Sequence, residues 1–222
     1  MSLDKNKTDK ELGLMISDYL KTKGVETPKI EGHKTDKEKI AVIDKSFKVI
    51  LETLGLDLSD DSLKDTSRRV SSMFINEVFW GLEASNFPKI TDIDNKMGYD
   101  SMVIERNINV QSKCEHHFVE IDGLATVAYI PKNKVLGLSK LNRVVEYFSK
   151  RPQVQERLTE QIYYSLEYIL ETSDIAVLIN AKHFCVKSRG VEDTGSDTFT
   201  SKLGGKFKTD SMLRTEFFTM IK

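Results

Sequence analysis

The chain has 222 residues, of which 39% are hydrophobic and 30% are charged, and its formal net charge at pH 7 is −1. This composition is typical of a folded protein with a sizeable core, and the near-neutral charge argues against a basic surface for nucleic acid. The amino-terminal residues are polar and no apolar run approaches the roughly 20 residues of a membrane span, so we expect neither a secretory signal nor a membrane partner.

Residues 1–100 are predicted to form an N-terminal helical region followed by a connector. Thr8–Glu11 and Thr35–Glu38 both match the capping box, in which two side chains satisfy free backbone donors at a helix start. Each box precedes a stripe of apolar residues at helical spacing. A third helix is predicted from Thr66 to Trp80, and residues 82–100, which mix Asn, Pro, Asp and Gly, are predicted to be the connector.

Residues 101–222 are predicted to form a second, mixed unit, because runs rich in Val, Ile and Thr now alternate with helical stripes. The predicted strands are Met102–Ser112, Leu124–Ile130 and Ile175–Val186, and Thr194–Phe207 is predicted to be a strand or a hairpin broken at Gly204–Gly205. The predicted helices are one capped by Ser139, a longer one with Pro152 in its first turn, and a short closing helix from Met212 to Ile221. We therefore expect an α+β fold.

Both cysteines of the chain lie beside histidines. Cys114 is followed by His116 and His117, and His183 precedes Cys185. Thiolate and imidazole ligands suit zinc better than magnesium or calcium. The Cys-x-x-His spacing after a predicted strand lets Cys114 and His117 converge on one ion, and Cys185 lies at the end of another predicted strand. We therefore predict a Zn²⁺ site with these three ligands, while His33, in a polar loop, is assigned no role.

Three protein ligands leave one coordination position for water, whose pKa zinc lowers toward about 7, as in catalytic zinc sites. His116 and His183 would then remain beside the metal, where an imidazole can move protons. Three other interpretations stay open: a disulfide between Cys114 and Cys185, His183 as a fourth ligand of a closed structural site, and His116 as a surface residue. Two cysteines without an export signal favour a cytoplasmic protein.

A second group of candidate residues is cationic. Lys140 and Arg143 follow Ser139 at a predicted helix start, and a helix amino terminus with cations beside it suits a polyanion such as triphosphate. Arg189 follows the last cysteine, and Arg69 on the third helix could add to the group. The alternative is that these cations are simply solvated.

Gln155 and Glu156 lie in the first turn of the long predicted helix. A carboxylate beside an amide can bind the donor edge of guanine. A glutamate in a first turn is also favoured by the helix dipole alone, so this assignment stays open on the residues alone.

Taken together, these motifs resemble the GTP cyclohydrolase I family. The resemblance is dense from about residue 60 to the carboxyl terminus, and the order and spacing of the blocks are specific to the family. The matching blocks are Cys114–His117, Ala128–Pro131, Gly137–Lys140 with Arg143, Gln153–Thr159, and His183–Cys185 with Arg189–Gly190.

The resemblance implies the tunnelling fold, an antiparallel four-stranded sheet with two inserted helices, preceded by the N-terminal helical region. It also implies a homo-oligomer, a decamer of two stacked pentameric rings. In such an assembly the sheets of five subunits close into a barrel, and the active sites lie between subunits.

The implied reaction converts GTP and water to 7,8-dihydroneopterin triphosphate and formate, the first step of folate or other pterin biosynthesis. In this reaction, water activated by zinc attacks C8 of the purine and His183 protonates N7. His116 and Ser139 then handle protons while the ribose opens and rearranges. The family's zinc ligands map onto Cys114, His117 and Cys185.

The substrate contacts implied by the resemblance are guanine readers at Gln155 and Glu156 and a set of triphosphate cations. The cations are Lys140, Arg143, Arg189 and Arg69. The chain departs from the family at Ser67 and Ser72, where many relatives carry proline and lysine. Arg68 is the nearest substitute for that lysine, so one phosphate contact differs from the family pattern.

Two alternatives to this enzyme use the same residues. One is a non-catalytic, zinc-stabilised binding module of the same fold. The other is a related tunnelling-fold enzyme that acts on a different purine or pterin. The two spare histidines beside the Cys-x-x-His pair, together with Gln155 and Glu156, favour the GTP cyclohydrolase.

Overall fold

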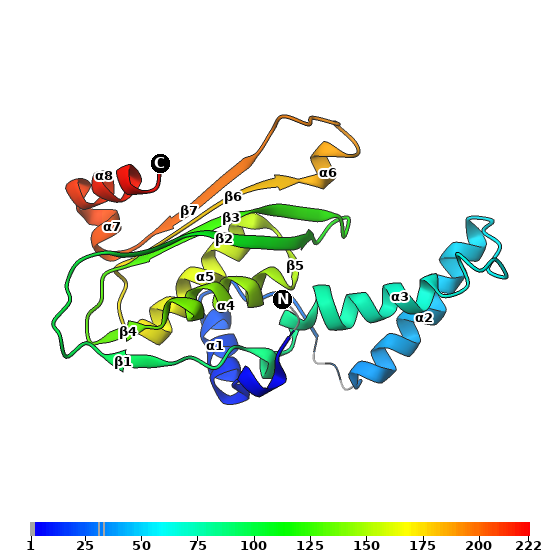
Figure 1. The fold of residues 1–222 in the computed structure, drawn as a ribbon, viewed down its shortest axis with the longest axis horizontal. Helices are drawn as coiled ribbons and strands as arrows, with labels where there is room; N and C mark the ends of the chain where they lie inside the picture. Colours follow the sequence, from blue (N-terminus) through cyan, green and yellow to red (C-terminus); the bar gives the residue numbers. More distant parts are fainter. Residues whose placement is uncertain (1–2, 31, 33) are drawn as a thin grey trace.

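The computed structural model describes residues 3–30, 32 and 34–222, so His33 lies outside the described residues. A long curled sheet forms the centre, with α1, α4 and α5 below it in the view of Figure 1. The α-helices are α1 (Lys10–Thr22), α2 (Asp36–Thr53), α3 (Thr66–Met73), α4 (Leu138–Ser149), α5 (Gln155–Leu170), α6 (Phe184–Lys187), α7 (Gly205–Thr209) and α8 (Ser211–Met220). The strands are β1 (Asp92–Asp94), β2 (Val103–Cys114), β3 (Glu120–Tyr129), β4 (Lys134–Leu136), β5 (Pro152–Gln153), β6 (Ile175–His183) and β7 (Thr198–Leu203).

The main sheet has the strand order β5-β2-β3-β6-β7. Strands β2, β3, β6 and β7 pair antiparallel, and β5 adds a two-residue parallel pairing beside the end of β2. A separate small sheet joins β1 to β4. Helices α4 and α5 lie in the connection between β3 and β6, which gives an α+β fold with its helices packed on an antiparallel sheet.

Alternation along the strands divides the core into two layers. Val177 and Ile179 of β6 face the main core with α4 and α5, whereas Ala176 and Leu178 face a smaller core with α7 and α8. Successive side chains of a strand point to opposite faces, so a run that is apolar at every position is covered on both faces. The near-continuous apolar sequence of β6 therefore has a direct structural cause.

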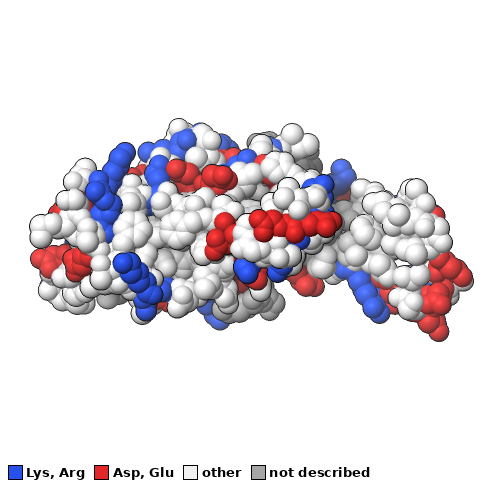
Figure 2. All heavy atoms as spheres, turned by 90° about the horizontal axis from the view of Figure 1, so that it is seen from above, with Lys and Arg blue, Asp and Glu red and all other residues white. Residues whose placement is uncertain are grey.

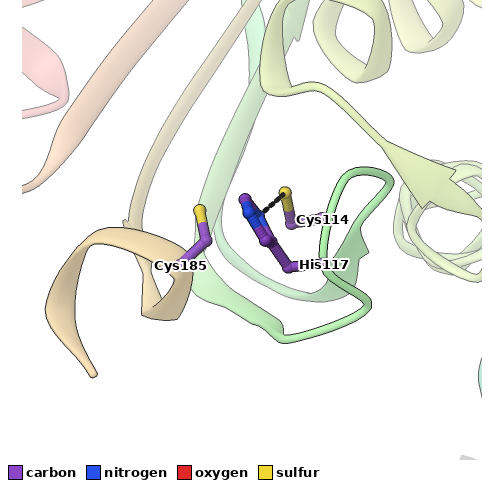
Figure 3. Close-up of side chains that lie close together, drawn as sticks. All are labelled: Cys114, His117 and Cys185. Atoms are coloured by element: carbon purple, nitrogen blue, oxygen red, sulfur yellow. Dashed lines mark hydrogen bonds between the residues drawn. The ribbon is translucent and has the colours of Figure 1, made fainter. Parts of the chain in front are cut away.

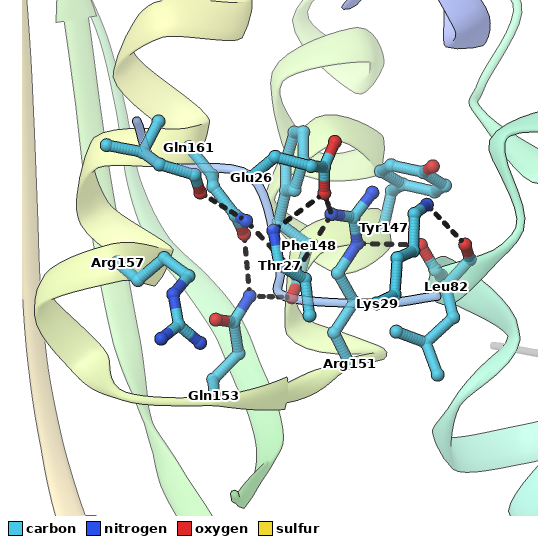
Figure 4. A network of polar contacts seen from close by, with 12 residues as sticks. Glu26, Thr27, Lys29, Leu82, Tyr147, Phe148, Arg151, Gln153, Arg157 and Gln161 are labelled. Atoms are coloured by element: carbon cyan, nitrogen blue, oxygen red, sulfur yellow. Dashed lines mark hydrogen bonds and ion pairs between the residues drawn. The ribbon is translucent and has the colours of Figure 1, made fainter. Parts of the chain in front are cut away.

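A buried arginine ties the segment after α1 to the main core. Arg151 is 1% exposed and donates from Nε to the Gly81 carbonyl at 2.6 Å and from Nη1 to Glu26 Oε1 at 2.7 Å. Its guanidinium lies over the rings of Tyr147 and Phe148, 4.7 Å from each centroid. Figure 4 shows these groups converging from four segments. The charge is stable in the interior because it is paired, hydrogen-bonded and stacked.

Helices α2 and α3 form an arm that projects away from the sheet and helices (Figure 1). Within α2 only Leu51 is buried, although the helix carries a long apolar stripe. The apolar side chains left exposed on and just after α2 are Val42, Val49, Ile50, Leu54 and Leu56. An exposed apolar stripe of this kind is typical of an interaction surface.

Charged side chains of both signs are interspersed over the face seen in Figure 2, with wide neutral areas between them. Acidic side chains gather at the end of the molecule where α2 connects to α3. Among the described residues, no helix has the length and apolar character needed to cross a membrane.

Several predicted elements are confirmed, with shifted ends. The capping box at Thr35–Glu38 is present in full. The box at Thr8–Glu11 was wrong, because Asp9 is the cap of α1 and accepts from the backbone of Leu12 at 3.0 Å. The third helix ends as an α-helix at Met73 and continues as one π-helical turn, Phe74–Val78.

Three further local predictions were wrong. Ser139 does not cap α4, because Gly137 occupies the cap position and the helix has no side-chain cap bond. Pro152 lies in β5 rather than in the first turn of α5, which begins at Gln155 after Val154. The predicted connector 82–100 contains the short strand β1, which pairs with β4.

Candidate metal centre and active site

The first half of the centre is the loop that follows β2. The carbonyl of Cys114 accepts from the backbone of Phe118 at 2.8 Å, and the backbone N–H of Cys114 donates to the Val119 carbonyl at 2.9 Å. These bonds close a tight turn that brings His117 back toward Cys114. The turn requires a left-handed backbone at Phe118, where φ is 54°, a conformation that costs a non-glycine residue roughly 1–2 kcal/mol.

The ring of Phe118 packs against two aromatic rings from the base of the arm. Its centroid lies 6.2 Å from that of Phe74 and 5.2 Å from that of Phe79. Phe74 begins the π-helical turn that follows α3. The loop that carries His117 is therefore anchored by aromatic contacts to the segment that leaves the arm.

The second half of the centre is the end of β6. His183 pairs in register with Ile121 near the start of β3, so β6 ends beside the loop after β2. The chain then turns into α6, which carries Cys185. The strand predicted to reach Val186 was therefore too long, and this early turn brings the Cys185 thiol toward Cys114 (Figure 3).

The ligand atoms of Cys114, His117 and Cys185 all lie within 4.8 Å of one another. Zinc–sulfur bonds of about 2.3 Å and zinc–nitrogen bonds of about 2.0–2.1 Å need ligand atoms at this kind of separation. Both cysteines are free thiols. Burial and the neighbouring Cys114 thiol raise the pKa of Cys185. A metal ion that binds here would therefore have to displace the thiol proton. Two sulfurs and one imidazole fit a zinc ion, and the cluster can hold a metal.

His116 lies outside this three-ligand group. Its ring is exposed, and its Nδ1 lies 3.6 Å from Cys114 Sγ. Arg189, predicted as a phosphate contact, lies at the same centre, with Nη1 2.9 Å from His117 Nε2. The structure thus gathers a cation and a spare imidazole around the three candidate ligands.

His183 is half-buried, and its Nε2 lies 2.7 Å from Gln155 Oε1. Burial lowers the pKa of His183, and the nearby carboxylate of Glu156 opposes that shift. Gln155 is 1% exposed whereas Glu156 is exposed, so the two predicted guanine readers have different environments. The first turn of α5 thus contacts His183, which lies two residues before the candidate ligand Cys185.

The structure does not bring Ser139 or Arg143 to this centre within one chain. Both residues line a cavity of about 450 Å³ between α4 and β2, together with Glu105 of β2. The stretch of β2 from Glu105 to Cys114 is roughly 25–30 Å long at about 3.3 Å per residue. Arg69 is exposed on α3, in the projecting arm.

Two neighbours of Lys140 were missed by sequence reasoning. Burial and the charges of Arg143, Lys89 and Lys7 lower the pKa of Lys140, so four cations lie near the start of α4. Lys7 and Lys89 are joined through the backbone, where the Lys89 N–H donates to the Lys7 carbonyl at 2.9 Å. No sequence motif predicts this pairing, because it depends on the N-terminal segment crossing residues 88–89.

A second pair that was missed involves the loop itself. Glu115 lies between two of the predicted site residues. Its carboxylate accepts hydrogen bonds from Nη1 and Nη2 of Arg157 on α5, with Nη2 to Oε1 at 3.3 Å. The backbone N–H of Glu115 also donates to the Gln153 carbonyl at 3.0 Å. The loop is therefore held by α5 and by β5.

Sequence comparison with known proteins identifies the family of this chain. The sequence pattern of GTP cyclohydrolase I matches residues 43–222. The chain belongs to the GTP cyclohydrolase I family. It is 51% identical over 212 residues to GTP cyclohydrolase 1 of Shewanella denitrificans, a match that covers 96% of this chain and 98% of that protein.

Other relatives give the same result. The chain is 52% identical to GTP cyclohydrolase 1 of Aeromonas salmonicida over 209 residues, covering 94% of this chain and 96% of the relative. It is 50% identical over 212 residues to GTP cyclohydrolase 1 of Shewanella oneidensis, with 96% and 98% covered. The similarity to the GTP cyclohydrolase I family therefore extends through α1 and most of the N-terminal region, where sequence reasoning found little signal.

Proposed function

We propose that this chain is a zinc-dependent hydrolase that converts GTP and water to 7,8-dihydroneopterin triphosphate and formate, the first step of folate or another pterin pathway. The observation that carries the proposal is the cluster of Cys114, His117 and Cys185, with His116 and His183 beside it but outside the ligand group. The identity of about half the residues to GTP cyclohydrolases 1 over nearly the full chain supports it.

In this proposal the two cysteines and His117 would hold the ion. When bound, it would lower the pKa of a water molecule enough for that water to serve at neutral pH as the nucleophile toward C8 of the purine. His183 gives a proton to N7 as the imidazole ring opens. Glu156, exposed at the first turn of α5, accepts from the donor edge of guanine with Gln155 beside it. His116, also exposed, handles protons during the later ribose rearrangement.

The remaining proposed residues act from a neighbouring subunit. Ser139 and Arg143 line the cavity between α4 and β2 rather than the candidate ligand cluster of their own chain. A second copy could place the start of its α4 at the cluster, so that Lys140 and Arg143, with Arg189, hold the triphosphate. Arg69 would reach the same phosphates from the arm of another copy.

We accordingly propose a homo-oligomer, a decamer of two pentameric rings. Two features support association: the apolar stripe exposed on α2, and the largely unpaired outer edges of β2 and β7 in the sheet. The curled sheet with α4 and α5 between its second and third long strands is compatible with the tunnelling fold. In this scheme residues 1–100 form the N-terminal helical region with its connector, and residues 101–222 form the catalytic domain.

The proposal includes a reducing, cytoplasmic setting, since the metal ligands must remain free thiols. Its test is to load the purified chain with Zn²⁺, add GTP, and follow formate release and the absorbance of the pterin. We expect both products in equal amounts. Binding of one zinc per chain without pterin formation would instead favour a zinc-stabilised binding module.

A further inference from the structure

The side chain of Gln155 lies at the beginning of α5, beneath the paired strands β6 and β7. Its Nε2 lies 3.1 Å from the Ile179 carbonyl, 2.9 Å from the Thr198 carbonyl and 3.0 Å from Thr200 Oγ1. Its Oε1 lies 2.7 Å from His183 Nε2. Both ends of this buried carboxamide are therefore occupied by partners from the protein itself.

These contacts fix which end of the carboxamide faces the histidine. Carbonyl oxygens can only accept hydrogen bonds, so the atom that faces Ile179 and Thr198 must be the amide nitrogen. The opposite assignment would direct the carboxamide oxygen at two other oxygens in a buried site, which costs free energy. The carboxamide oxygen therefore faces His183.

The orientation of the carboxamide in turn fixes the form of the imidazole. A carboxamide oxygen can only accept, so His183 Nε2 must carry a proton. In the neutral ring the remaining nitrogen, Nδ1, then holds the lone pair. A charged His183 that gives its Nδ1 proton to a base returns directly to this neutral form, and no rearrangement of its neighbours is required.

We propose that Gln155 is a positioning residue for His183, holding the imidazole with Nε2 protonated and Nδ1 free to exchange a proton with the purine. This inference rests on the proposed function and divides the work of the first turn of α5. Gln155 acts through His183. In this turn the side chain that binds the edge of guanine is the exposed carboxylate of Glu156. Substrate recognition by the Gln155 carboxamide would require it to leave the carbonyls of β6 and β7.

The experiment compares Gln155→Met, Glu156→Gln and Gln161→Met in the full-length, zinc-loaded chain, with GTP and inosine triphosphate as substrates. Inosine triphosphate lacks the 2-amino group, so it reports guanine recognition. We expect Gln155→Met to lower kcat by about 10²-fold, as misplacement of a reacting group does, with the KM for GTP and the preference for GTP nearly unchanged. Glu156→Gln should instead lose most of that preference.

Gln161→Met is the matched control. Gln161 is fully buried on the same helix, and its carboxamide donates to the Val25 carbonyl and to Thr27 Oγ1 rather than contacting a histidine. It should lose thermal stability as Gln155→Met does, without the fall in kcat. A Gln155→Met variant that raises KM or loses the preference for GTP, with kcat unchanged, would overturn the proposal.

A second measurement does not depend on turnover. NMR of the chain labelled with ¹⁵N-histidine, with His183→Ala to assign the signal, reports which ring nitrogen carries the proton. We expect His183 protonated at Nε2 in the parent chain and a mixture of the two forms in Gln155→Met. If that variant does not fold, the spectrum of the parent chain alone still tests which ring nitrogen of His183 carries the proton.

An unchanged histidine signal in Gln155→Met, or the Nδ1-protonated form in the parent chain, would refute the positioning role even if the enzyme is active. A parent chain that binds zinc but releases no formate would refute the proposed function, and the histidine spectra would still decide the role of Gln155.

Discussion

Two polar clusters meet at the pairing of β5 with the end of β2, and they differ in burial and in the groups that they bring together. The cluster around Arg151 is buried and joins a guanidinium, a carboxylate and several carbonyls in short hydrogen bonds (Figure 4). The cluster of Cys114, His117 and Cys185 is partly exposed and directs soft ligand atoms toward one another (Figure 3). The pairing of Cys114 with Gln153 links the two.

The difference shows which cluster stabilises the fold and which is available to a ligand. In the Arg151 network, only Glu26 Oε2 and Gln153 Oε1 are buried side-chain atoms without a hydrogen-bond partner among the described residues. The three candidate ligand side chains share one long contact, 3.8 Å between Cys114 Sγ and His117 Nδ1, and the separation of their ligand atoms suits a bound cation. Substitutions in the first cluster should therefore change stability, and those in the second should change metal binding and catalysis.

The largest expected effect is that of Cys185→Ser. It replaces a soft thiolate by a hydroxyl, which is a poor zinc ligand, so zinc and catalysis should be lost together. Metal content by mass spectrometry and formate release from GTP would measure the two losses, while denaturant unfolding should show a folded chain. Full activity without zinc would disprove the ligand assignment.

His183→Ala should separate metal binding from chemistry. Zinc content should stay near that of the parent chain, since His183 lies outside the ligand group. The rate of formate release should fall by about 10²–10⁴-fold, the usual contribution of a general acid or base. Single-turnover kinetics with metal analysis would check this, and loss of the metal would identify His183 as a ligand after all.

Arg151→Met tests the other cluster. It leaves the Glu26 carboxylate buried without its partner, and removal of one member of a buried ion pair costs about 3–5 kcal/mol of unfolding free energy. Urea unfolding of the zinc-free chain would measure the loss. Adding Glu26→Gln should recover part of it, because the unpaired charge is then gone. If the double variant were as unstable as the sum of the two single variants, the pair would not be coupled.

Glu115→Gln probes the contact that links α5 to the metal loop. Removing the charge weakens the ion pair with Arg157, which loosens the loop that carries Cys114 and His117, so zinc affinity should fall. Competition with a chromophoric zinc chelator would measure it. Glu160→Gln, which breaks the Lys202–Glu160 pair on the same helix, is the matched control and should leave zinc affinity unchanged. Equal affinities in both variants would show that the loop needs no such anchor.

The sequence predicted that Cys114, His117 and Cys185 lie together because the pattern that carries this prediction is local and rare. Cys114 and His117 share one loop, and Cys185 is the second of two cysteines in the chain. The position of Cys185 on α6, rather than at the end of a strand, was not predictable, because an apolar run does not indicate where a strand stops. The α+β class followed from the change of hydrophobic period near residue 102.

Contacts that depend on distant backbone could not be predicted. The partners of the Gln155 carboxamide include the carbonyl of Thr198, on a strand far along the chain, and a carbonyl has no sequence signature. The cap of α4 was assigned to Ser139 on propensity, yet the chain enters that helix from β4 and Gly137 reaches the cap position first. The separation of Ser139 from the ligands is likewise a property of the length of β2.

The left-handed backbone at Phe118 has a mechanical consequence. A glycine would adopt this conformation freely, whereas phenylalanine holds it at a cost that its ring contacts with Phe74 and Phe79 can offset. The torsion next to His117 is thus maintained by a hydrophobic plug belonging to the base of the arm. A displacement of the base of the arm would therefore act, through these ring contacts, on the turn that presents the His117 imidazole.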